Sequence, residues 1–304
     1  MTGRKILLLG KDGQLGWELQ RALAPLGELA AFGRAEADFS DPDALRARVR
    51  ALRPDLIVNA AAYTAVDKAE SDTAMAHLVN AVAPGVLAEE ARDCGAWLVH
   101  YSTDYVFDGS KDGAWVETDA TNPLSAYGRS KCEGEVRIRA AGARHLILRT
   151  SWVFAGRGGN FARTMLRLAK ERETLTVVAD QFGAPTGAEL LADATALALY
   201  RIAGRGDGAD ALSGTYHLAA SGATSWHGYA RHVVEQALLH GAELKAGPDG
   251  VLPIPASAYP APAARPANSR LDCSKFQDSF DLHLPDWRHH VNRLIAELAT
   301  QGKP

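Results

Sequence analysis

The sequence predicts an α/β fold built on a doubly wound parallel sheet, followed by a smaller C-terminal domain. In the first half, short β-type runs alternate with longer amphipathic stretches. A glycine-rich turn directly follows the first run, and the alternation fades after about Thr150. Strands alternating with helices of this length indicate βαβ units. Right-handed crossovers then place helices on both faces of the sheet.

The expected strands and helices of the first half follow one another in order. The expected strands are Lys5–Leu9, Glu28–Phe32, Leu56–Asn59, Trp97–Tyr101 and His145–Arg149. The expected helices between them are Trp17–Leu26, Asp43–Leu52 and Ala74–Cys94. We therefore predict one domain over residues 1–150, of the Rossmann type that binds dinucleotides.

The second half is less regular, and its apolar spacing predicts mostly helices. The expected elements are helices at Phe161–Glu171, Ala188–Ala203, Trp226–His240 and Trp287–Leu298, and a strand-like run at Thr215–Leu218. The segment Gly247–Asn268 is dense in Pro and Ala, which predicts a loop or extended chain at the surface. We expect residues 151–304 to form mainly a substrate-binding domain, with some helices returning to the Rossmann sheet.

Composition argues against several classes of partner. The 304 residues carry 33 basic and 36 acidic side chains, a net charge of −3, without the basic face typical of nucleic-acid binders. No apolar stretch approaches the roughly 18 residues that span a bilayer, and the run Ile6–Leu9 is too short for a signal peptide. The three cysteines form no CxxC pair, so we expect neither a zinc site nor a disulfide framework. We predict a cytoplasmic protein without membrane or nucleic-acid partners.

A glycine-rich turn connects the first strand to the first helix. It runs Gly10, Lys11, Asp12, Gly13, Gln14, Leu15, Gly16. Glycines allow a sharp turn and a close approach to a pyrophosphate, and the helix N-terminus offers free N–H groups to the anion. The turn therefore predicts a dinucleotide site. Its GxxGxxG spacing is typical of extended short-chain dehydrogenases/reductases.

The end of the second expected strand bears on the choice of cofactor. An acidic residue there would bind the ribose hydroxyls of NAD. Here the strand runs into Gly33 and Arg34, and Arg34 either pairs with a 2′-phosphate or is a solvated surface charge. The residues accommodate NADPH and leave the choice between NADPH and NADH open.

Tyr127 and Lys131 are the candidate proton-transfer pair. Four residues apart on a helix, they share one face. A nearby ammonium is expected to lower the pKa of a tyrosine, which could then protonate the alkoxide formed when hydride reaches a carbonyl carbon. Upstream, Ser102 and Thr103 end the fourth strand, at the edge where open α/β sheets bind ligands. A hydroxyl there could stabilise charge on the carbonyl oxygen, whereas either residue taken alone could be only a strand-end cap.

Several segments together resemble one family. They are GKDGQLGWELQRAL, PDLIVNAAAYTAVDKAE, HYSTDYVFDG, TDATNPLSAYGRSK, LRTSWVFAGRGGNF, DQFGAPTG, TYHLAASG and PANSRLDCSKF. Over nearly the whole chain, they resemble the dTDP-4-dehydrorhamnose reductase family. The resemblance implies reduction of dTDP-4-dehydro-L-rhamnose to dTDP-L-rhamnose with NADPH or NADH. This reaction supplies rhamnose for cell-surface polysaccharide such as the O-antigen of lipopolysaccharide.

The resemblance also implies roles for individual residues. Thr103, Tyr127 and Lys131 would be the catalytic trio. The cofactor would be lined by Gly10, Gly13, Gln14, Leu15, Gly16, Arg34, Asp38, Phe39, Ala62, Tyr63 and Thr64, with Tyr127 and Lys131. The substrate would contact Val66, Thr103, Asp104, Tyr105 and Trp152. Magnesium at the subunit contact of a homodimer would be held by Glu18, Glu189 and Glu297, three carboxylates suited to a hard cation.

Two other functions remain open from sequence. A nucleotide-sugar epimerase or dehydratase of the same superfamily would retain its nicotinamide between half-reactions, and Asp104 beside Thr103 could serve as the extra acid. A non-catalytic regulatory subunit, similar to the beta subunit of methionine adenosyltransferase, would usually tolerate loss of the Tyr127–Lys131 pair, yet both residues are present.

Overall fold

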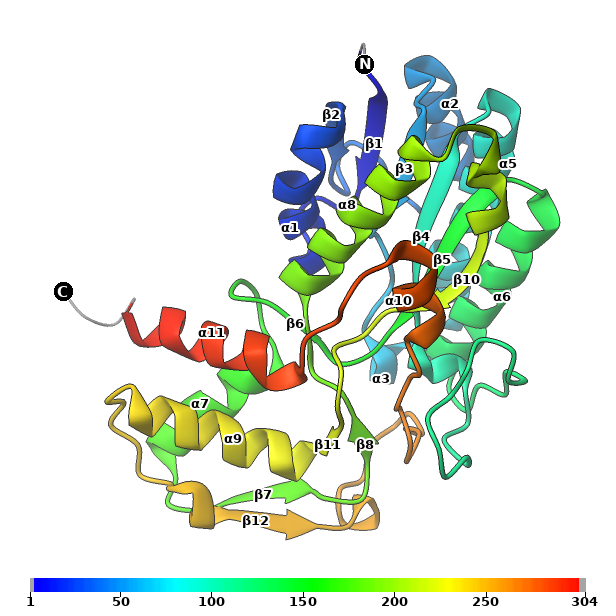
Figure 1. Ribbon diagram of the computed structural model, residues 1–304. Helices are drawn as coiled ribbons and strands as arrows, with labels where there is room; N and C mark the ends of the chain where they lie inside the picture. Colours follow the sequence, from blue (N-terminus) through cyan, green and yellow to red (C-terminus); the bar gives the residue numbers. More distant parts are fainter. Residues whose placement is uncertain (1–2, 301–304) are drawn as a thin grey trace.

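The computed structural model describes residues 3–300 and is organised around one six-stranded parallel sheet (Figure 1). Its strands lie in the order β10-β5-β4-β3-β1-β2. They are β1 (Lys5–Leu9), β2 (Glu28–Phe32), β3 (Leu56–Asn59), β4 (Trp97–Thr103), β5 (Arg144–Thr150) and β10 (Gly214–His217). Every pairing in the sheet is parallel, so the carboxyl ends of the strands meet at one edge.

Alternate residues of the central strands serve two different cores. On β1, Ile6 and Leu8 belong to one buried cluster, whereas Leu7 and Leu9 belong to another. Side chains of a strand point alternately to opposite faces, so an almost wholly apolar strand needs a covered layer on both sides. All four residues are completely buried, which explains why this run reads as a strand without polar alternation.

Helices cover both faces of the sheet. On one face lie α1 (Gln14–Leu23) and α8 (Ala188–Gly204), which pack against each other. The other face is covered by α2 (Pro42–Leu52), α5 (Ala83–Cys94) and α6 (Ala126–Ala141). Short helices α3 (Val66–Ala69) and α4 (Thr73–His77) follow β3, and α4 continues into α5 through a π-helical turn at Leu78–Val82.

A second group of elements lies beyond the carboxyl edge of the sheet (Figure 1). It contains α7 (Phe161–Glu171), α9 (Trp226–Leu239) and α11 (Trp287–Thr300). The short helix α10 (Ser274–Phe280) does not belong to this group, because it packs against β10 and α8 of the sheet layer. The strands of the second group form two-stranded pairs: β6 (Val153–Phe154) with β9 (Thr186–Gly187), β7 (Leu175–Val178) with β12 (Val251–Ile254), and β8 (Phe182–Gly183) with β11 (Thr224–Ser225). Short 3₁₀ turns complete the connections, at Ala24–Leu26, Asp104–Val106, Gly206–Leu212, Pro248–Gly250 and Ala256–Ala258.

The expected α/β class and parallel sheet are confirmed. Two local expectations needed correction. The single helix expected at Ala74–Cys94 is α4, the π-turn and α5, and the widened turn precedes Pro84, which has no N–H to continue the α-helical ladder. The segment Gly247–Asn268 contains β12, whose pairing with β7 is set by tertiary contacts. The division at residue 150 stays a prediction, and within residues 3–300 no helix has the length and apolarity to cross a membrane.

Candidate active site

The turn after β1 is shaped by close backbone contacts. Gly10 has a φ of +86°, and a Cβ there would lie 2.7 Å from the backbone nitrogen of Ala61. A Cβ on Gly16 would lie 1.9 Å from the carbonyl oxygen of Gly10. Gly16 was expected at the cofactor, but it does not line the cleft described below. Its role is to let α1 pack directly onto the turn.

Gly13 has a different environment, because it faces open space. A Cβ there would meet only the Gly10 carbonyl oxygen, at 3.4 Å. Gly13 is also the N-cap of α1, and it provides no side-chain hydrogen bond to the first N–H groups of the helix. Free N–H groups at a helix N-terminus attract anions. The turn therefore fits a pyrophosphate at the start of α1.

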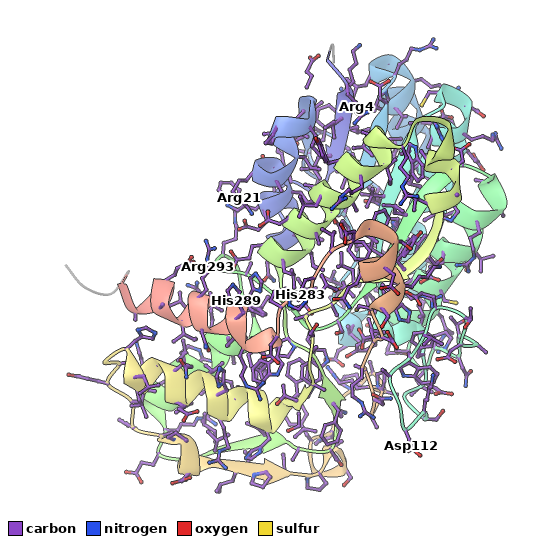
Figure 2. The ribbon with its side chains drawn as sticks, viewed as in Figure 1. Arg4, Arg21, Asp112, His283, His289 and Arg293 are labelled. Carbon is purple, nitrogen blue, oxygen red and sulfur yellow. The ribbon has the colours of Figure 1, made fainter. Side chains whose placement is uncertain are left out.

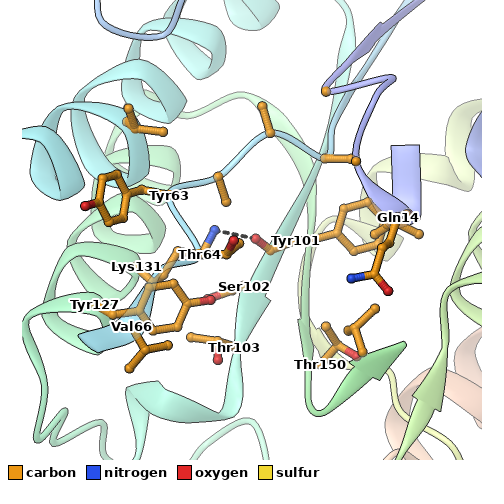
Figure 3. A pocket seen from close by; sticks show the side chains of 18 of the residues that line it. Gln14, Tyr63, Thr64, Val66, Tyr101, Ser102, Thr103, Tyr127, Lys131 and Thr150 are labelled. Carbon is orange, nitrogen blue, oxygen red and sulfur yellow. Dashed lines mark hydrogen bonds between the residues drawn. The ribbon is translucent and has the colours of Figure 1, made fainter. Parts of the chain in front are cut away.

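Two buried polar atoms near this turn have no protein partner among the described residues. They are Oε1 of Gln14 and Oγ1 of Thr150, and both residues line the cleft (Figure 3). The amide nitrogen of Gln14 donates to the carbonyl oxygen of Gly159 at 3.3 Å, which fixes the amide. Buried polar groups without a partner are rare in folded proteins, so these two atoms fit hydrogen bonds to a ligand.

The rim of the cleft carries the residues expected near the adenosine end. Arg34 and Asp38 are exposed, while Phe39 is buried beneath them. Hydrogen bonds from Ser40 lower the pKa of Asp38. Ala62, Tyr63, Thr64 and Val66 continue the rim after β3. The Tyr63 backbone N–H donates to Oδ1 of Asn80 at 2.8 Å, which holds this segment against the buried Asn80.

Two successive hydroxyls at the end of β4 have different surroundings. Ser102 donates to Oε1 of Glu135 at 2.6 Å, and Glu135 also pairs with the buried Arg149 at 2.7 Å. Thr103 instead accepts from the Tyr105 N–H and donates to Asp104, both at 3.1 Å. The hydroxyl of Ser102 is therefore committed to an internal ion pair. Thr103 is the better placed of the two to serve a ligand.

Tyr127 lies in the first turn of α6, which is capped by the Ser125 side chain. Burial raises the pKa of Tyr127 to about 12, while the Thr103 hydroxyl acts in the opposite direction. We expected the Lys131 ammonium to lower this pKa, and burial outweighs that effect in the net shift. The phenol holds its proton across the physiological range, as a proton donor must before it acts.

Lys131 lies one turn further along α6 and is only 2% exposed. Its ammonium nitrogen donates to the Tyr101 carbonyl oxygen at 2.6 Å (Figure 3) and lies 3.2 Å from Nε2 of His100. Burial lowers the pKa of Lys131 to about 8, and the charge of Glu135 opposes that shift. An amine that changes charge near neutral pH is thus held under the cleft.

A carboxyl group and a phenol, those of Asp104 and Tyr105, follow Thr103 in the chain. Burial raises the pKa of Asp104 to about 6, which places its titration close to neutral pH. Tyr105 packs edge-on against the ring of Tyr127, with ring centroids 5.6 Å apart. Burial also raises the pKa of Tyr105. Both residues line the cleft, as expected for groups near a substrate.

Trp152 stacks on a second tryptophan that sequence reasoning missed. The rings of Trp152 and Trp226 lie 3.6 Å apart between centroids and 13° from parallel. Trp152 has a φ of +48°, which is costly for a bulky residue and typical of functional sites. A Cβ on Gly183 would lie 2.7 Å from the Trp152 ring, so this close contact requires glycine. Nothing in the local sequence distinguishes Trp226 from an ordinary packed aromatic.

These side chains face one cleft of about 1030 Å³ at the carboxyl edge of the sheet. The expected residues that line it are Gly10, Gly13, Gln14, Leu15, Arg34, Asp38, Phe39, Ala62, Tyr63, Thr64, Val66, Ser102, Thr103, Asp104, Tyr105, Tyr127, Lys131 and Trp152. Further lining residues that the sequence did not single out include Lys68, Thr150 and Trp226. A cleft of this size admits a dinucleotide and a second ligand side by side.

Glu18, Glu189 and Glu297 lie apart from this cleft. The guanidinium of Arg293 lies 3.3 Å from Glu189 and 3.1 Å from Glu297, and Glu18 pairs with Arg21 at 3.5 Å. Figure 2 places Arg21 on α1 and Arg293 on α11, on the same side of the molecule. Within residues 3–300, no group of three or more acidic, histidine or cysteine side chains is placed to hold a metal ion. As arranged here, arginines supply the positive charge, and the carboxylates do not fit magnesium.

Comparison with known sequences places the chain among sugar-nucleotide reductases. The family model described as the RmlD substrate binding domain matches residues 4–300. The dTDP-4-dehydrorhamnose reductase of Escherichia coli K12 is 55% identical over 299 residues, which cover 97% of this chain and 98% of the relative. The reductase of the same name from Burkholderia thailandensis is 50% identical, over 98% of this chain and its whole length.

Comparison with solved structures gives the same family. The crystal structure of dTDP-4-dehydrorhamnose reductase from Bacillus anthracis, in complex with NADP, superposes with a TM-score of 0.85. It is 31% identical in sequence, and the match covers 97% of this chain and 100% of that chain.

Proposed function

Because the chain belongs to the dTDP-4-dehydrorhamnose reductase family, we propose that Thr103, Tyr127 and Lys131 carry out its reaction. That reaction is the NAD(P)H-dependent reduction of the 4-keto group of dTDP-4-dehydro-L-rhamnose to give dTDP-L-rhamnose. The observation that carries the assignment is that all three side chains line one cleft at the carboxyl edge of the sheet. Ligands bind at this edge in open α/β sheets.

Tyr127 is the proposed proton donor. When bound, the reduced nicotinamide supplies a hydride to the carbonyl carbon. The carbonyl oxygen becomes an alkoxide, and the Tyr127 O–H bond breaks as the alcohol O–H bond forms. Burial keeps the phenol protonated until this moment, since its pKa is about 12. Lys131, beneath the same cleft, offsets the charge left on the phenolate.

Thr103, Asp104 and the paired tryptophans position the sugar in this proposal. When the sugar is bound, the Thr103 O–H turns from Asp104 to the carbonyl oxygen and favours the charge that develops there. Asp104 accepts from sugar hydroxyls. The indole of Trp152, backed by Trp226, offers a flat apolar surface to the sugar ring. Val66 and Tyr105 complete this side of the cleft.

The cofactor side is formed by the glycine turn and the rim. Gly13 and the N-terminus of α1 would hold the pyrophosphate, while Gln14 and Thr150 would bond polar groups of the cofactor. Arg34 stands where it can pair with a 2′-phosphate, which supports use of NADPH, and the NADP bound to the Bacillus anthracis relative agrees. The preference over NADH stays a prediction.

Magnesium binding and dimer formation stay predictions of the family resemblance. The three glutamates would have to exchange Arg293 and Arg21 for a metal ion, which makes the chain's own side chains a poor site. Size-exclusion chromatography with EDTA or with magnesium tests both at once. A dimer that persists in EDTA would show that dimer formation does not need magnesium. A monomer under both conditions would contradict the predicted homodimer.

We also propose a cytoplasmic role in rhamnose supply for lipopolysaccharide or O-antigen, without membrane or nucleic-acid partners. The reaction needs reduced nicotinamide, which is regenerated in the cytoplasm. Fractionation of cells followed by immunodetection tests the location. Loss of rhamnose from surface polysaccharide on deletion tests the role.

The activity is tested on the purified protein with dTDP-4-keto sugars, using NADPH and NADH in parallel. The proposal predicts one cofactor oxidised per sugar reduced. An epimerase or dehydratase would turn over substrate without net consumption of cofactor. A regulatory subunit would show no turnover, and its biological role would survive Tyr127→Phe. Either result would contradict the proposal.

A further inference from the structure

A buried chain of three side chains runs beneath the cleft and ends at Lys131. Asn59 closes β3, His100 lies in the middle of β4, and Lys131 is on α6. All three are at most 2% exposed. The side-chain nitrogen of Asn59 lies 3.0 Å from Nδ1 of His100, and Nε2 of His100 lies 3.2 Å from Nζ of Lys131. The positions of the hydrogen atoms on these three side chains follow from the backbone groups that Asn59 and Lys131 contact.

The orientation of the Asn59 amide is set by the backbone. The N–H of Ala61 donates to Asn59 at 3.0 Å, and because a backbone N–H can only donate, the atom it meets is the oxygen Oδ1. The NH₂ group of Asn59 therefore faces His100. An NH₂ group can only donate, so Nδ1 of His100 accepts and carries no hydrogen.

His100 then has its single hydrogen on Nε2, the nitrogen that faces Lys131. A neutral imidazole carries one N–H, and burial together with the Lys131 charge lowers the pKa of His100 well below its usual value. An ammonium has no lone pair and would meet this N–H as a second donor. A neutral amine can accept from Nε2 while it still donates to the Tyr101 carbonyl oxygen.

We propose that Asn59 and His100 are positioning residues that favour the neutral form of Lys131 and so make its proton available to the reaction. The inference rests on the proposed role of Tyr127. After Tyr127 has given its proton to the alkoxide, the Lys131 N–H bond breaks and the phenolate O–H bond reforms. The neutral amine that remains accepts the hydrogen bond from His100, and water returns a proton to Lys131 before the next cycle.

Other titratable groups around Lys131 act on it in known directions. Glu135 on the same helix raises the pKa of Lys131, and burial lowers it. Tyr127 on α6 lines the same cleft, and its pKa of about 12 keeps it neutral where Lys131 titrates. Asp104 after β4 also lines the cleft, and with a pKa of about 6 it is ionised in that range. His100 is therefore the group on β4 that opposes the ammonium through a hydrogen bond.

The first test reads the tautomer in the resting protein, without turnover. Histidine labelled with ¹⁵N shows by its chemical shifts which ring nitrogen carries the hydrogen, and His100→Gln identifies the signal. We expect hydrogen on Nε2. His145 serves as an internal reference, because its Nδ1 lies 2.8 Å from the Ala143 carbonyl oxygen and must donate. Hydrogen on Nδ1 of His100 would overturn the inference and leave the reductase activity untouched.

The second test reverses the tautomer with Asn59→Asp, which is nearly isosteric. A carboxylate would accept from Nδ1 of His100, leaving the Nε2 lone pair to accept from the Lys131 ammonium. We expect the alkaline limb of log kcat/KM against pH to move up by about one unit or more. His145→Gln removes a histidine at the start of β5, far from the cleft, and should leave the limb in place. A folded Asn59→Asp protein with an unmoved limb would refute the coupling.

Discussion

Two groups of polar side chains near the carboxyl end of β4 differ in how their oxygen atoms are paired. In the first group, Ser102, Glu135 and Arg149, the hydroxyl and both carboxylate oxygens are bonded. Nη1 of Arg149 has no hydrogen-bond partner among the described residues, and its guanidinium lies 5.0 Å from the centroid of the Phe107 ring. We call these three residues the Glu135 network. In the second group, Gln14 and Thr150 have buried oxygens without a protein partner. A carboxylate whose two oxygens are both bonded holds the strand end in place, whereas buried oxygens that line the cleft without a partner are positions for a ligand. The difference separates structural polar residues from functional ones that sequence alone presents alike.

The Glu135 network should be the most costly of these places to disturb. Arg149→Met removes the buried cation that pairs with Glu135 and leaves the Ser102 hydroxyl and the half-exposed Arg139 as partners of the buried carboxylate. We expect a loss of about 3–5 kcal/mol in the free energy of unfolding, measured by urea denaturation. The double variant with Glu135→Leu should recover much of that loss. A single variant as stable as the wild type would show that the network does not support the strand end.

The neighbouring hydroxyls of β4 give a matched pair of variants. Thr103→Val should lower kcat by about 100-fold, the scale of a lost donor to a developing oxyanion. Ser102→Ala removes a hydroxyl that is bonded only to Glu135 and should leave kcat within about twofold while costing roughly 1–2 kcal/mol of stability. Steady-state kinetics on both proteins distinguish the two roles. An equal loss of kcat in both variants would show that the Ser102 and Thr103 hydroxyls do not differ in their role in catalysis.

The pH profile reports the amine beneath the cleft. The lowered pKa of Lys131, about 8, means that its ammonium is present below that pH and is lost above it. If the cation supports Tyr127, kcat/KM should be level below pH 8 and fall by about tenfold per unit above it. A profile that stays flat to pH 10 would show that the charge of Lys131 is not needed.

The smallest effect on the reaction is expected from a change in the Trp152–Trp226 pair, which lines the cleft. Trp226→Leu removes the ring that supports Trp152 and should raise KM for the nucleotide sugar by roughly 3- to 10-fold, equivalent to about 0.5–1.5 kcal/mol. We expect kcat to change little, because neither indole takes part in proton transfer. A lower kcat with unchanged KM would contradict the proposed contact between Trp152 and the sugar.

Sequence predicted the regular parts of the fold well because their signals are local. The first three strands match their expected bounds, since each is a short apolar run closed by a turn. β12 was missed because its partner β7 lies more than seventy residues away in the chain, and only tertiary pairing makes a strand of a proline-containing segment.

The residues of the candidate site also fall into two groups: those that the sequence motifs predicted and those that only the folded structure brings together. Thr103, Tyr127 and Lys131 could be named from their order and motif, and the structure places them on one cleft. The raised pKa of Tyr127 could not be read from sequence, because spacing on a helix does not reveal burial. The contact between Trp226 and Trp152, and the contacts that link Asn59, His100 and Lys131, are between residues far apart in sequence. These contacts can be recognised only in the folded structure.

The proposed reaction depends on Tyr127 to deliver the proton within a preformed cleft. The most direct measurement is single-turnover reduction by Tyr127→Phe, followed through nicotinamide absorbance, with cofactor and nucleotide-sugar binding measured by calorimetry on the same protein. We predict that both ligands still bind within a few-fold of wild type and that reduction slows by at least about 100-fold. Reduction at the wild-type rate would contradict the account.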